Sequence, residues 1–235
     1  MSVLNKETAR CYNLGNERQS VLVKIGGKTG EGIDSTGEML VYIAKECGLE
    51  VNTFRSFPSV IVGGSTAYEA HIASRPIYAR GDEVHVMVAF DQESMDAIAP
   101  EMAEVGLAIF DSDSVKAYSE AKSSQQFIGI PLRKMARELG NPIVRNMIAL
   151  GVVVKLLDLD LSTAKRTVEN KFSSKGEKVV QSNIAALERG YEYEDEDGKL
   201  KPLFSLPTAQ KTEKLFLSGN EAMAFGALAA QCKVF

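Results

Sequence analysis

The segment of this sequence best suited to chemistry is a glycine-rich loop at residues 26–32, Gly-Gly-Lys-Thr-Gly-Glu-Gly. An apolar run at 21–25 precedes it and a helical pattern follows, so the loop should join a buried strand to the first turn of a helix. Backbone N–H groups at such a helix start lack partners within the helix and can receive an anion. The loop therefore predicts phosphate-like binding through Gly27, Lys28, Thr29, Gly30 and Gly32.

Two common phosphate motifs do not fit this loop. The dinucleotide fingerprint G-x-G-x-x-G fails because the glycines at 27, 30 and 32 have the reverse spacing. Leu22 stands where a P-loop needs its first glycine. Arg55, after the next expected strand, would suit a 2′-phosphate, so an NADP site stays open as an alternative. A purely structural role, in which the glycines let the turn pass close to the sheet, also stays open.

No catalytic set is recognisable in the sequence. His71 and His85 fall within expected strands, where we interpret them as packed or edge histidines. The serines at 56, 59 and 65 lack the strand–turn–helix context of a nucleophile elbow. We therefore assign no catalytic residue to this chain.

Metal ligation has no support in the residue spacing. The three cysteines, Cys11, Cys47 and Cys232, are odd in number and far apart, and the sequence contains no C-x-x-C run. This pattern favours inert thiols over a disulfide framework, a zinc site or an iron–sulfur site. We expect no metal ligand here, and any redox metal of the functional protein should be held by another polypeptide or domain.

The 235 residues carry a net charge of −4 and are 45% hydrophobic, enough for one globular core with an appendage. An acidic chain without a basic patch argues against nucleic-acid binding. Residues 1–19 carry charges and no apolar run, so they predict neither a secretory signal nor a membrane span. The cytoplasm is the expected compartment.

The periodicity of apolar residues predicts alternating strands and helices in the first half of the chain. Strands are expected at 21–25, 50–54, 65–73, 84–90, 107–110 and 127–130, and helices at 33–47, from Asp91 to about 105, 132–139, 143–157, 161–172 and 177–190. Such alternation indicates an α/β fold, a Rossmann-like three-layer sandwich with a mostly parallel sheet and a helical second half packed onto it.

The composition divides the chain into four parts. An N-terminal extension, 1–19, precedes the main domain, 20–192. The acidic and proline-containing stretch at 193–212 is interpreted as a solvated linker and not as a metal-binding cluster. Residues 213–235 predict a strand at 215–217 and a helix at 221–230, a unit too short to bury its own core.

Several segments, in this order, resemble a known family. Residues 25–33, 57–64 and 75–77 look like the gamma domain of 2-oxoacid:ferredoxin oxidoreductases, and 146–151 and 183–190 resemble the two Asn/Gly-marked helices that close this domain. Residues 219–230, Gly-Asn-Glu-Ala-Met-Ala-Phe-Gly-Ala-Leu-Ala-Ala, are similar to the opening of the alpha, pyrimidine-type thiamine domain in members where gamma and alpha are fused. The resemblance covers about residues 20–235.

The resemblance implies an enzyme that oxidatively decarboxylates a 2-oxoacid such as pyruvate or 2-oxoglutarate, usually to an acyl-CoA. It implies thiamine pyrophosphate and Mg on the alpha and beta parts, and [4Fe–4S] clusters that pass electrons to ferredoxin. The gamma domain would bind no cofactor alone but would help to bind or gate CoA, which adds Ser59, Gly63 and Gly64 to the candidate binding residues. The implied partners are the beta subunit, the remainder of the alpha domain, and a ferredoxin-like cluster subunit or external ferredoxin, in a hetero-oligomer.

Two positions depart from the family pattern. Val62 stands where the family commonly has arginine, and Gln231 replaces an expected glycine. The loss of that arginine leaves CoA use open. Lys28, Arg55 and Arg80 remain as cations near the expected loops, and Lys28 is the first choice for an anion contact. An independent NADP-binding oxidoreductase and a pure assembly module remain the alternatives.

Overall fold

The computed structural model describes residues 19–56, 64–195, 197–198, 200–206 and 214–233. Nearly all of the expected N-terminal extension therefore lies outside the described residues. So do two of the candidate binding residues, Ser59 and Gly63, and the departure at Val62.

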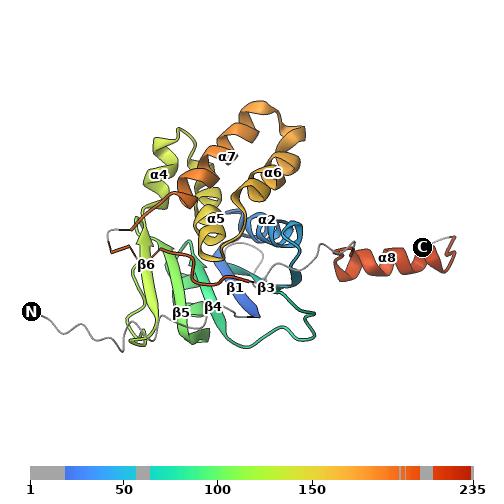
Figure 1. The fold of residues 1–235 in the computed structure, drawn as a ribbon, viewed down its shortest axis with the longest axis horizontal. Coiled ribbons are helices and arrows are strands. Elements are labelled where there is room, and N and C mark those ends of the chain that lie inside the picture. The colour runs from blue at the N-terminus through green and yellow to red at the C-terminus, as the bar shows by residue number, and fades with distance from the viewer. Residues whose placement is uncertain (1–18, 57–63, 196, 199, 207–213, 234–235) are drawn as a thin grey trace, which may run out of the picture.

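A six-stranded sheet forms the centre of the protein, in the order β2-β3-β1-β4-β5-β6 (Figure 1). Its strands are β1 (Ser20–Lys28), β2 (Glu50–Ser56), β3 (Ser65–Ala73), β4 (Val84–Ala89), β5 (Met102–Asp111) and β6 (Gln126–Ile130). Only β3 runs antiparallel to its neighbours. The connection from β2 to β3 is shorter than the dozen or so residues that a parallel crossover needs, so this pair forms antiparallel. The expected mostly parallel α/β sheet is confirmed.

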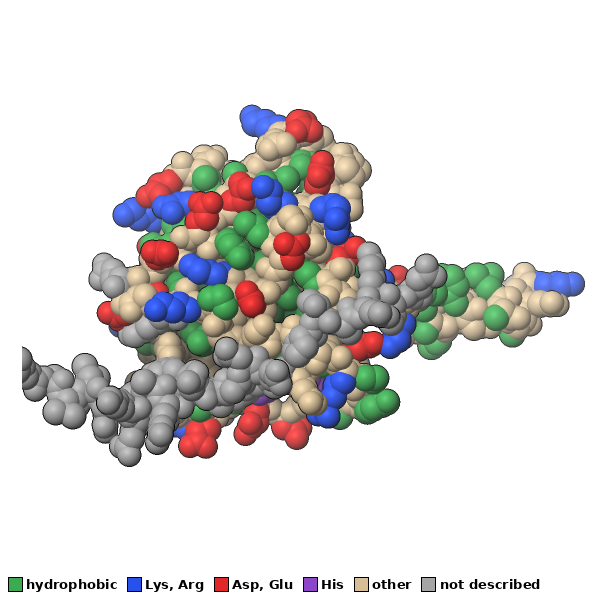
Figure 2. Space-filling view, in the orientation of Figure 1, with side chains coloured by type: hydrophobic (Ala, Val, Ile, Leu, Met, Phe, Trp, Pro, Cys, Tyr) green, Lys and Arg blue, Asp and Glu red, His purple; other side chains and the backbone are tan. Residues whose placement is uncertain are grey.

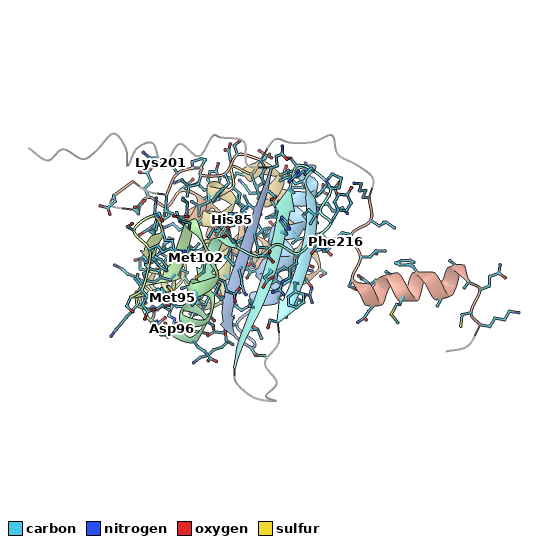
Figure 3. All side chains as sticks on the ribbon, turned by 90° about the horizontal axis from the view of Figure 1, so that it is seen from below. His85, Met95, Asp96, Met102, Lys201 and Phe216 are labelled. Atoms are coloured by element: carbon cyan, nitrogen blue, oxygen red, sulfur yellow. The ribbon has the colours of Figure 1, made fainter. Side chains whose placement is uncertain are left out.

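Alternation along the strands supplies two buried faces. In β1, Val23 and Ile25 face the larger core, which includes side chains of α2 (Ile33–Glu46) and α5 (Arg145–Leu156). Leu22 points to the opposite face and packs in a smaller cluster with Met95 of α3 (Gln92–Ile98). Met95 and Met102 of that cluster are labelled in Figure 3. Helices on both faces of a sheet make the three expected layers.

Three helices of the second half form an outer tier over α2 and α5 (Figure 1). They are α4 (Leu132–Glu138), α6 (Leu161–Phe172) and α7 (Glu177–Tyr191). The Asp160 carboxylate caps α6 by accepting hydrogen bonds from the Ser162 hydroxyl and the Thr163 N–H, which lower the pKa of Asp160 to about 2. No described helix is long and apolar enough to cross a lipid bilayer.

The helix expected from Asp91 to about 105 is shorter in the structure. Asp91 does cap it, since its carboxylate accepts the Ser94 N–H, but α3 ends at Ile98. A short 3-10 helix, Ala99–Glu101, follows and β5 starts at Met102. Pro100 causes the early end because it has no N–H to continue the helical hydrogen bonds.

The expected solvated linker is wrong for the described residues of 193–206. Leu200, Phe204 and Leu206 are buried in the larger core. The N–H groups of Leu203 and Phe204 donate to the Leu156 carbonyl at the end of α5, at 2.9 and 3.1 Å. This segment is therefore a strap across the domain, because its apolar residues cover the end of α5 despite the acidic run that precedes them.

Lys214 and Phe216, which precede the last helix, contact the domain at one edge. Phe216 packs edge-to-face on Tyr42 of α2 at 6.1 Å, and Lys214 pairs with Glu50 (Figure 3). The strand expected at 215–217 does not form, since these residues pair with no described strand. Beyond them α8 (Gly219–Ala229), with a capping box between Ser218 and Glu221, projects away from the domain (Figures 1 and 2).

Two glycines let α5 and α7 cross in backbone contact. A Cβ atom at Gly151 would lie 2.0 Å from the Leu187 carbonyl oxygen, and one at Gly190 would lie 1.9 Å from the Ile148 carbonyl oxygen. Both contacts are with helix backbone, which cannot move aside as a flexible side chain can. Replacement of either glycine must push the two helices apart.

We expect Gly190→Ala to lower the free energy of unfolding by about 2–3 kcal/mol, because the added methyl group overpacks this crossing. Gly226→Ala is the matched control, since Gly226 is also helical but a Cβ there meets nothing within 4 Å. Urea denaturation followed by circular dichroism measures both variants. Equal midpoints for Gly190→Ala and Gly226→Ala would contradict the close crossing.

Candidate functional site

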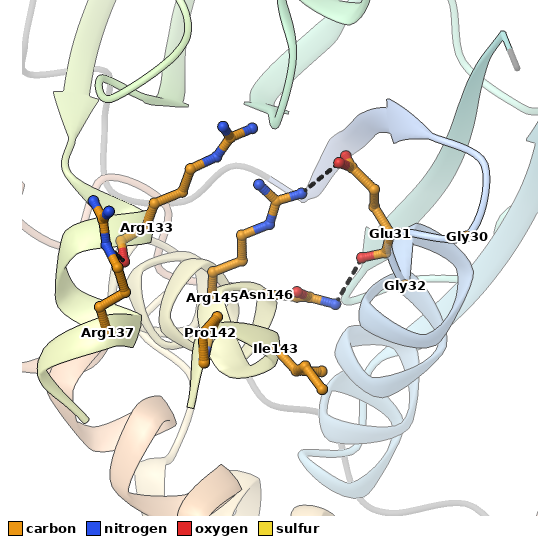
Figure 4. A pocket seen from close by; sticks show the side chains of 9 residues that line it. All are labelled: Gly30, Glu31, Gly32, Arg133, Arg137, Pro142, Ile143, Arg145 and Asn146. Atoms are coloured by element: carbon orange, nitrogen blue, oxygen red, sulfur yellow. Dashed lines mark hydrogen bonds and ion pairs between the residues drawn. The ribbon is translucent and has the colours of Figure 1, made fainter. Parts of the chain in front are cut away.

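A cavity of about 610 Å³ opens at the carboxyl ends of the parallel strands. In an open α/β sheet this edge is where ligands bind, and the volume is in the range of small-molecule sites. Figure 4 shows its lining. The lining residues are Gly30, Glu31, Gly32, Arg133, Arg137, Pro142, Ile143, Arg145 and Asn146.

The glycine loop forms one wall of this cavity. Gly30 and Gly32 both have left-handed backbone angles, with φ of 90° and 81°. A Cβ atom at Gly32 would lie 2.3 Å from Nδ2 of Asn146, which donates a hydrogen bond of 3.0 Å to the Glu31 carbonyl. At Gly30 a Cβ would meet nothing within 4 Å. Gly32 is therefore needed for two reasons, its left-handed backbone conformation and the close approach of Asn146 of α5. Gly30 is needed for its left-handed conformation alone.

Three arginines from two helices form the opposite wall. Arg133 and Arg137 lie one turn apart on α4, directly after β6, and Arg145 is the first residue of α5. Their guanidinium groups project to the same side of the cavity (Figure 4). The Arg137 side chain is 67% exposed, whereas that of Arg145 is 12% exposed.

Carboxylates hold these arginines in place. Asp111, the last residue of β5, is fully buried, and its Oδ2 lies 2.9 Å from Nε of Arg133 and 3.7 Å from Nη1 of Arg145. Glu31 Oε1 lies 2.8 Å from Nη2 of Arg145. Asp113 lies 3.9 Å from Arg137, too far for a good hydrogen bond. Carboxylates thus hold Arg133 and Arg145 in place, whereas the Arg137 guanidinium is only loosely paired.

This arrangement can bind an anion. The described residues that line the cavity include no histidine, cysteine, serine or lysine, and the carboxylate of Glu31 pairs with Arg145. Within the described part of the chain, no group of three or more His, Cys, Asp or Glu side chains could hold a metal ion. Guanidinium groups recognise phosphate oxygens in a bidentate geometry. The cavity therefore fits a phosphate-bearing ligand.

Of the sequence-derived candidates that the structure describes, Gly30 and Gly32 line this cavity. Gly27 is buried and a Cβ there would lie 2.5 Å from Ile33, so its role is packing. Thr29 donates its N–H and its hydroxyl to the Gly64 carbonyl, at 3.4 and 3.3 Å. Lys28, the first choice for an anion contact, is exposed at the end of β1 and does not line the cavity.

The other two cations proposed from the sequence have carboxylate partners. Arg55 pairs with Glu38 and does not line the cavity. Arg80 makes a bidentate contact with the buried Glu69 carboxylate, which also pairs with Lys24 at 3.0 Å. Burial alone would raise the pKa of Glu69, but the hydrogen bonds from Arg80 and Lys24 hold it below its ordinary value. These contacts stabilise β2 and β3.

Both histidines are packed as expected. Nδ1 of His71 lies 3.1 Å from the Ala79 carbonyl oxygen. Nδ1 of His85 accepts the Leu22 N–H at 3.0 Å.

Sequence reasoning missed the arginine wall. Arg133 and Arg137 stand four residues apart at the start of a helix that directly follows an expected strand. That spacing places both on one helix face at the carboxyl edge of the sheet, a signal that the sequence does contain. Arg145 carried no comparable signal, because its position depends on how α5 packs.

Comparisons with known proteins agree with this fold. The family model for pyruvate ferredoxin/flavodoxin oxidoreductase matches residues 23–193. The ketoisovalerate oxidoreductase subunit VorA of Methanothermobacter thermautotrophicus is 28% identical over 184 residues, which cover 77% of this chain and 38% of that relative. The chain thus spans little more than a third of the length of this curated relative.

Two solved structures share the fold. The 2-oxoglutarate:ferredoxin oxidoreductase from Magnetococcus marinus, described with 2-oxoglutarate, coenzyme A and succinyl-CoA bound, superposes with a TM-score of 0.82 and 27% identity, over 90% of this chain and 37% of that one. A keto/oxoacid ferredoxin oxidoreductase gamma subunit from Geobacter sulfurreducens has a TM-score of 0.63 and 24% identity, over 74% of this chain and 96% of that subunit.

The family model covers most of the domain that carries the glycine loop and the arginine wall. The chain belongs to the pyruvate ferredoxin/flavodoxin oxidoreductase family.

Proposed function

We propose that this chain is the gamma-type, non-catalytic part of a 2-oxoacid:ferredoxin oxidoreductase, and that its arginine-lined cavity receives the phosphate groups of CoA. The observation that carries this proposal is the meeting of three arginines with the glycine loop at the carboxyl edge of the sheet. CoA carries a pyrophosphate and a 3′-phosphate, the groups that arginine forks bind best.

The three arginines among the described lining residues support a binding role. Family membership supports a place in the oxidoreductase, and a structural neighbour described with CoA bound supports the choice of ligand. The proposed enzyme also uses thiamine pyrophosphate, Mg and [4Fe–4S] clusters, and the described residues contain no group of three or more His, Cys, Asp or Glu side chains that could hold a metal ion. We assign those groups to the beta subunit, to the remainder of the alpha domain and to a cluster subunit or external ferredoxin, all within a cytoplasmic hetero-oligomer.

The exposed apolar side chains of the C-terminal helix support a role of this chain in assembly. Met223, Phe225 and Leu228 of α8 are 75%, 55% and 70% exposed and make no contact with the described domain. We place residues 213–235 at the start of the alpha-type domain, against which these side chains would be buried. At about 25 cal/mol per Å² of apolar area, burial of three large side chains stabilises such an interface by several kcal/mol.

We expect CoA to bind the 235-residue chain in isothermal titration calorimetry and Arg137→Gln to weaken that binding about fivefold, because one exposed guanidinium group is removed from the wall. Arg189→Gln is the matched control. Arg189 is similarly exposed but lies on α7 and does not line the cavity.

The same titration separates the alternatives. Binding of NADPH but not CoA would favour the NADP-dependent oxidoreductase, and binding of neither would favour the assembly module. Equal losses in Arg137→Gln and Arg189→Gln would show that the cavity does not hold the ligand.

For the loop, we expect Gly30→Val to lower the free energy of unfolding by about 1–2 kcal/mol, since a β-branched residue is strained at positive φ. Gly30→Asn should lower the free energy of unfolding clearly less than Gly30→Val, because asparagine tolerates the left-handed region. Thermal denaturation compares the two. An undisturbed melting temperature in Gly30→Val would show that the loop does not need this conformation.

For α8, we expect its amide hydrogens to exchange rapidly in the isolated chain and slowly in the assembled enzyme. A short helix without tertiary contacts is marginal in water. The internal reference is α5, whose buried amides should exchange slowly in both states. Slow exchange of residues 219–229 in the monomeric chain would place α8 in the gamma-type domain.

A further inference from the structure

The glycine loop carries a carboxylate of its own at the border of the cavity. Glu31 Oε1 lies 2.8 Å from Nη2 of Arg145, and its Oε2 accepts the Lys28 N–H at 3.3 Å. These two donors, a guanidinium group and a main-chain N–H of the loop, are of the kinds that a phosphate at this position would need. The Glu31 side chain therefore occupies the place of a ligand.

The backbone of Glu31 is anchored while its side chain is not enclosed. Asn146 donates to the Glu31 carbonyl at 3.0 Å, and the Glu31 N–H donates to the Lys28 carbonyl at 3.1 Å. The Glu31 side chain is 26% exposed and borders the cavity (Figure 4). Rotation about its side-chain torsions can thus withdraw the carboxylate from Arg145 without moving the loop.

Asp111, the other carboxylate beside Arg145, is different. It is fully buried and held by Nε of Arg133, by the Asp113 N–H and by the Ser114 hydroxyl. A buried carboxylate with several donors is costly to displace. Asp111 is therefore a permanent counter-ion of the arginine wall, whereas Glu31 is exchangeable.

We infer that Glu31 is a built-in competing ligand that reserves the Arg145 position for multiply charged phosphoryl anions. An incoming anion must replace the carboxylate on Arg145 and on the Lys28 N–H. This competition reduces the affinity of every anion by the same factor. Pyrophosphate, with several charged oxygens, still binds, whereas acetate and chloride fall below useful affinity.

This inference deepens the proposed function, because it rests on the same cavity. Glu31 determines how tightly an anion must bind in order to displace its carboxylate from Arg145. The Glu31 carboxylate itself makes no favourable contact with the ligand. It also explains how a cavity with three arginines keeps their charge balanced before a ligand arrives.

The test is calorimetric titration of the 235-residue chain with inorganic pyrophosphate and, separately, with CoA. We expect Glu31→Gln to bind pyrophosphate about tenfold more tightly than wild type, because the neutral amide competes weakly for Arg145. Glu38→Gln is the matched control. Glu38 lies on the adjoining helix α2, is similarly exposed at 29%, and pairs with Arg55 and Lys171 outside the cavity. The affinity of Glu38→Gln for pyrophosphate should stay within about twofold of that of wild type.

Each outcome decides between the two proposals. Unchanged or weaker pyrophosphate binding by Glu31→Gln overturns the inference, even if wild type binds CoA as proposed. Tighter pyrophosphate binding by Glu31→Gln without CoA binding in either protein keeps the inference and overturns the assignment of CoA. No binding of either probe to either protein overturns both.

A second measurement covers the case in which Glu31→Gln fails to fold. In wild type, the ¹³C chemical shift of the Glu31 carboxylate should change as pyrophosphate is added, because the carboxylate leaves Arg145. An unchanged shift at saturating pyrophosphate would overturn the inference.

Discussion

The buried carboxylate of Asp111 is the interaction on which the candidate site depends. It ends β5 and meets Arg133 of α4 and Arg145 of α5, so one charge ties the starts of two helices to the edge of the sheet. A carboxylate so deeply buried is tolerated only with charged or hydrogen-bonding partners. The same contacts therefore satisfy Asp111 and aim the arginines at the glycine loop. Loss of this charge would leave the arginine wall without its anchor.

A second constraint comes from the helical layer. α5 must approach the glycine loop closely enough for Asn146 to reach the Glu31 carbonyl, and it must also lie in backbone contact with α7. Glycines at both contacts, Gly32 on the loop and Gly151 and Gly190 at the crossing, make these approaches possible. The strap at 200–206 then closes the end of α5. Packing far from the cavity thus determines the geometry of its wall.

The cavity combines Arg133 and Arg145, which are held by carboxylates, with Arg137, whose side chain is largely exposed. Such an arrangement is suited to the binding and release of an anion. The apolar side chains of α8 are likewise exposed.

The sequence alone determined most of the elements, because strand and helix periodicity are local properties. It predicted β3 and α6 with their observed bounds, the glycine loop between β1 and α2, and the family resemblance. Two of the loop glycines that it singled out, Gly30 and Gly32, line the cavity. Errors arose where distant residues decide the outcome. Leu200, Phe204 and Leu206 are buried because the chain folds back onto the larger core, and none of the described strands pairs with residues 215–217. The arginine wall depended on tertiary structure most of all. Asn146 and the Glu31 carbonyl are 115 residues apart in sequence, and only the packing of α5 against the loop brings them together.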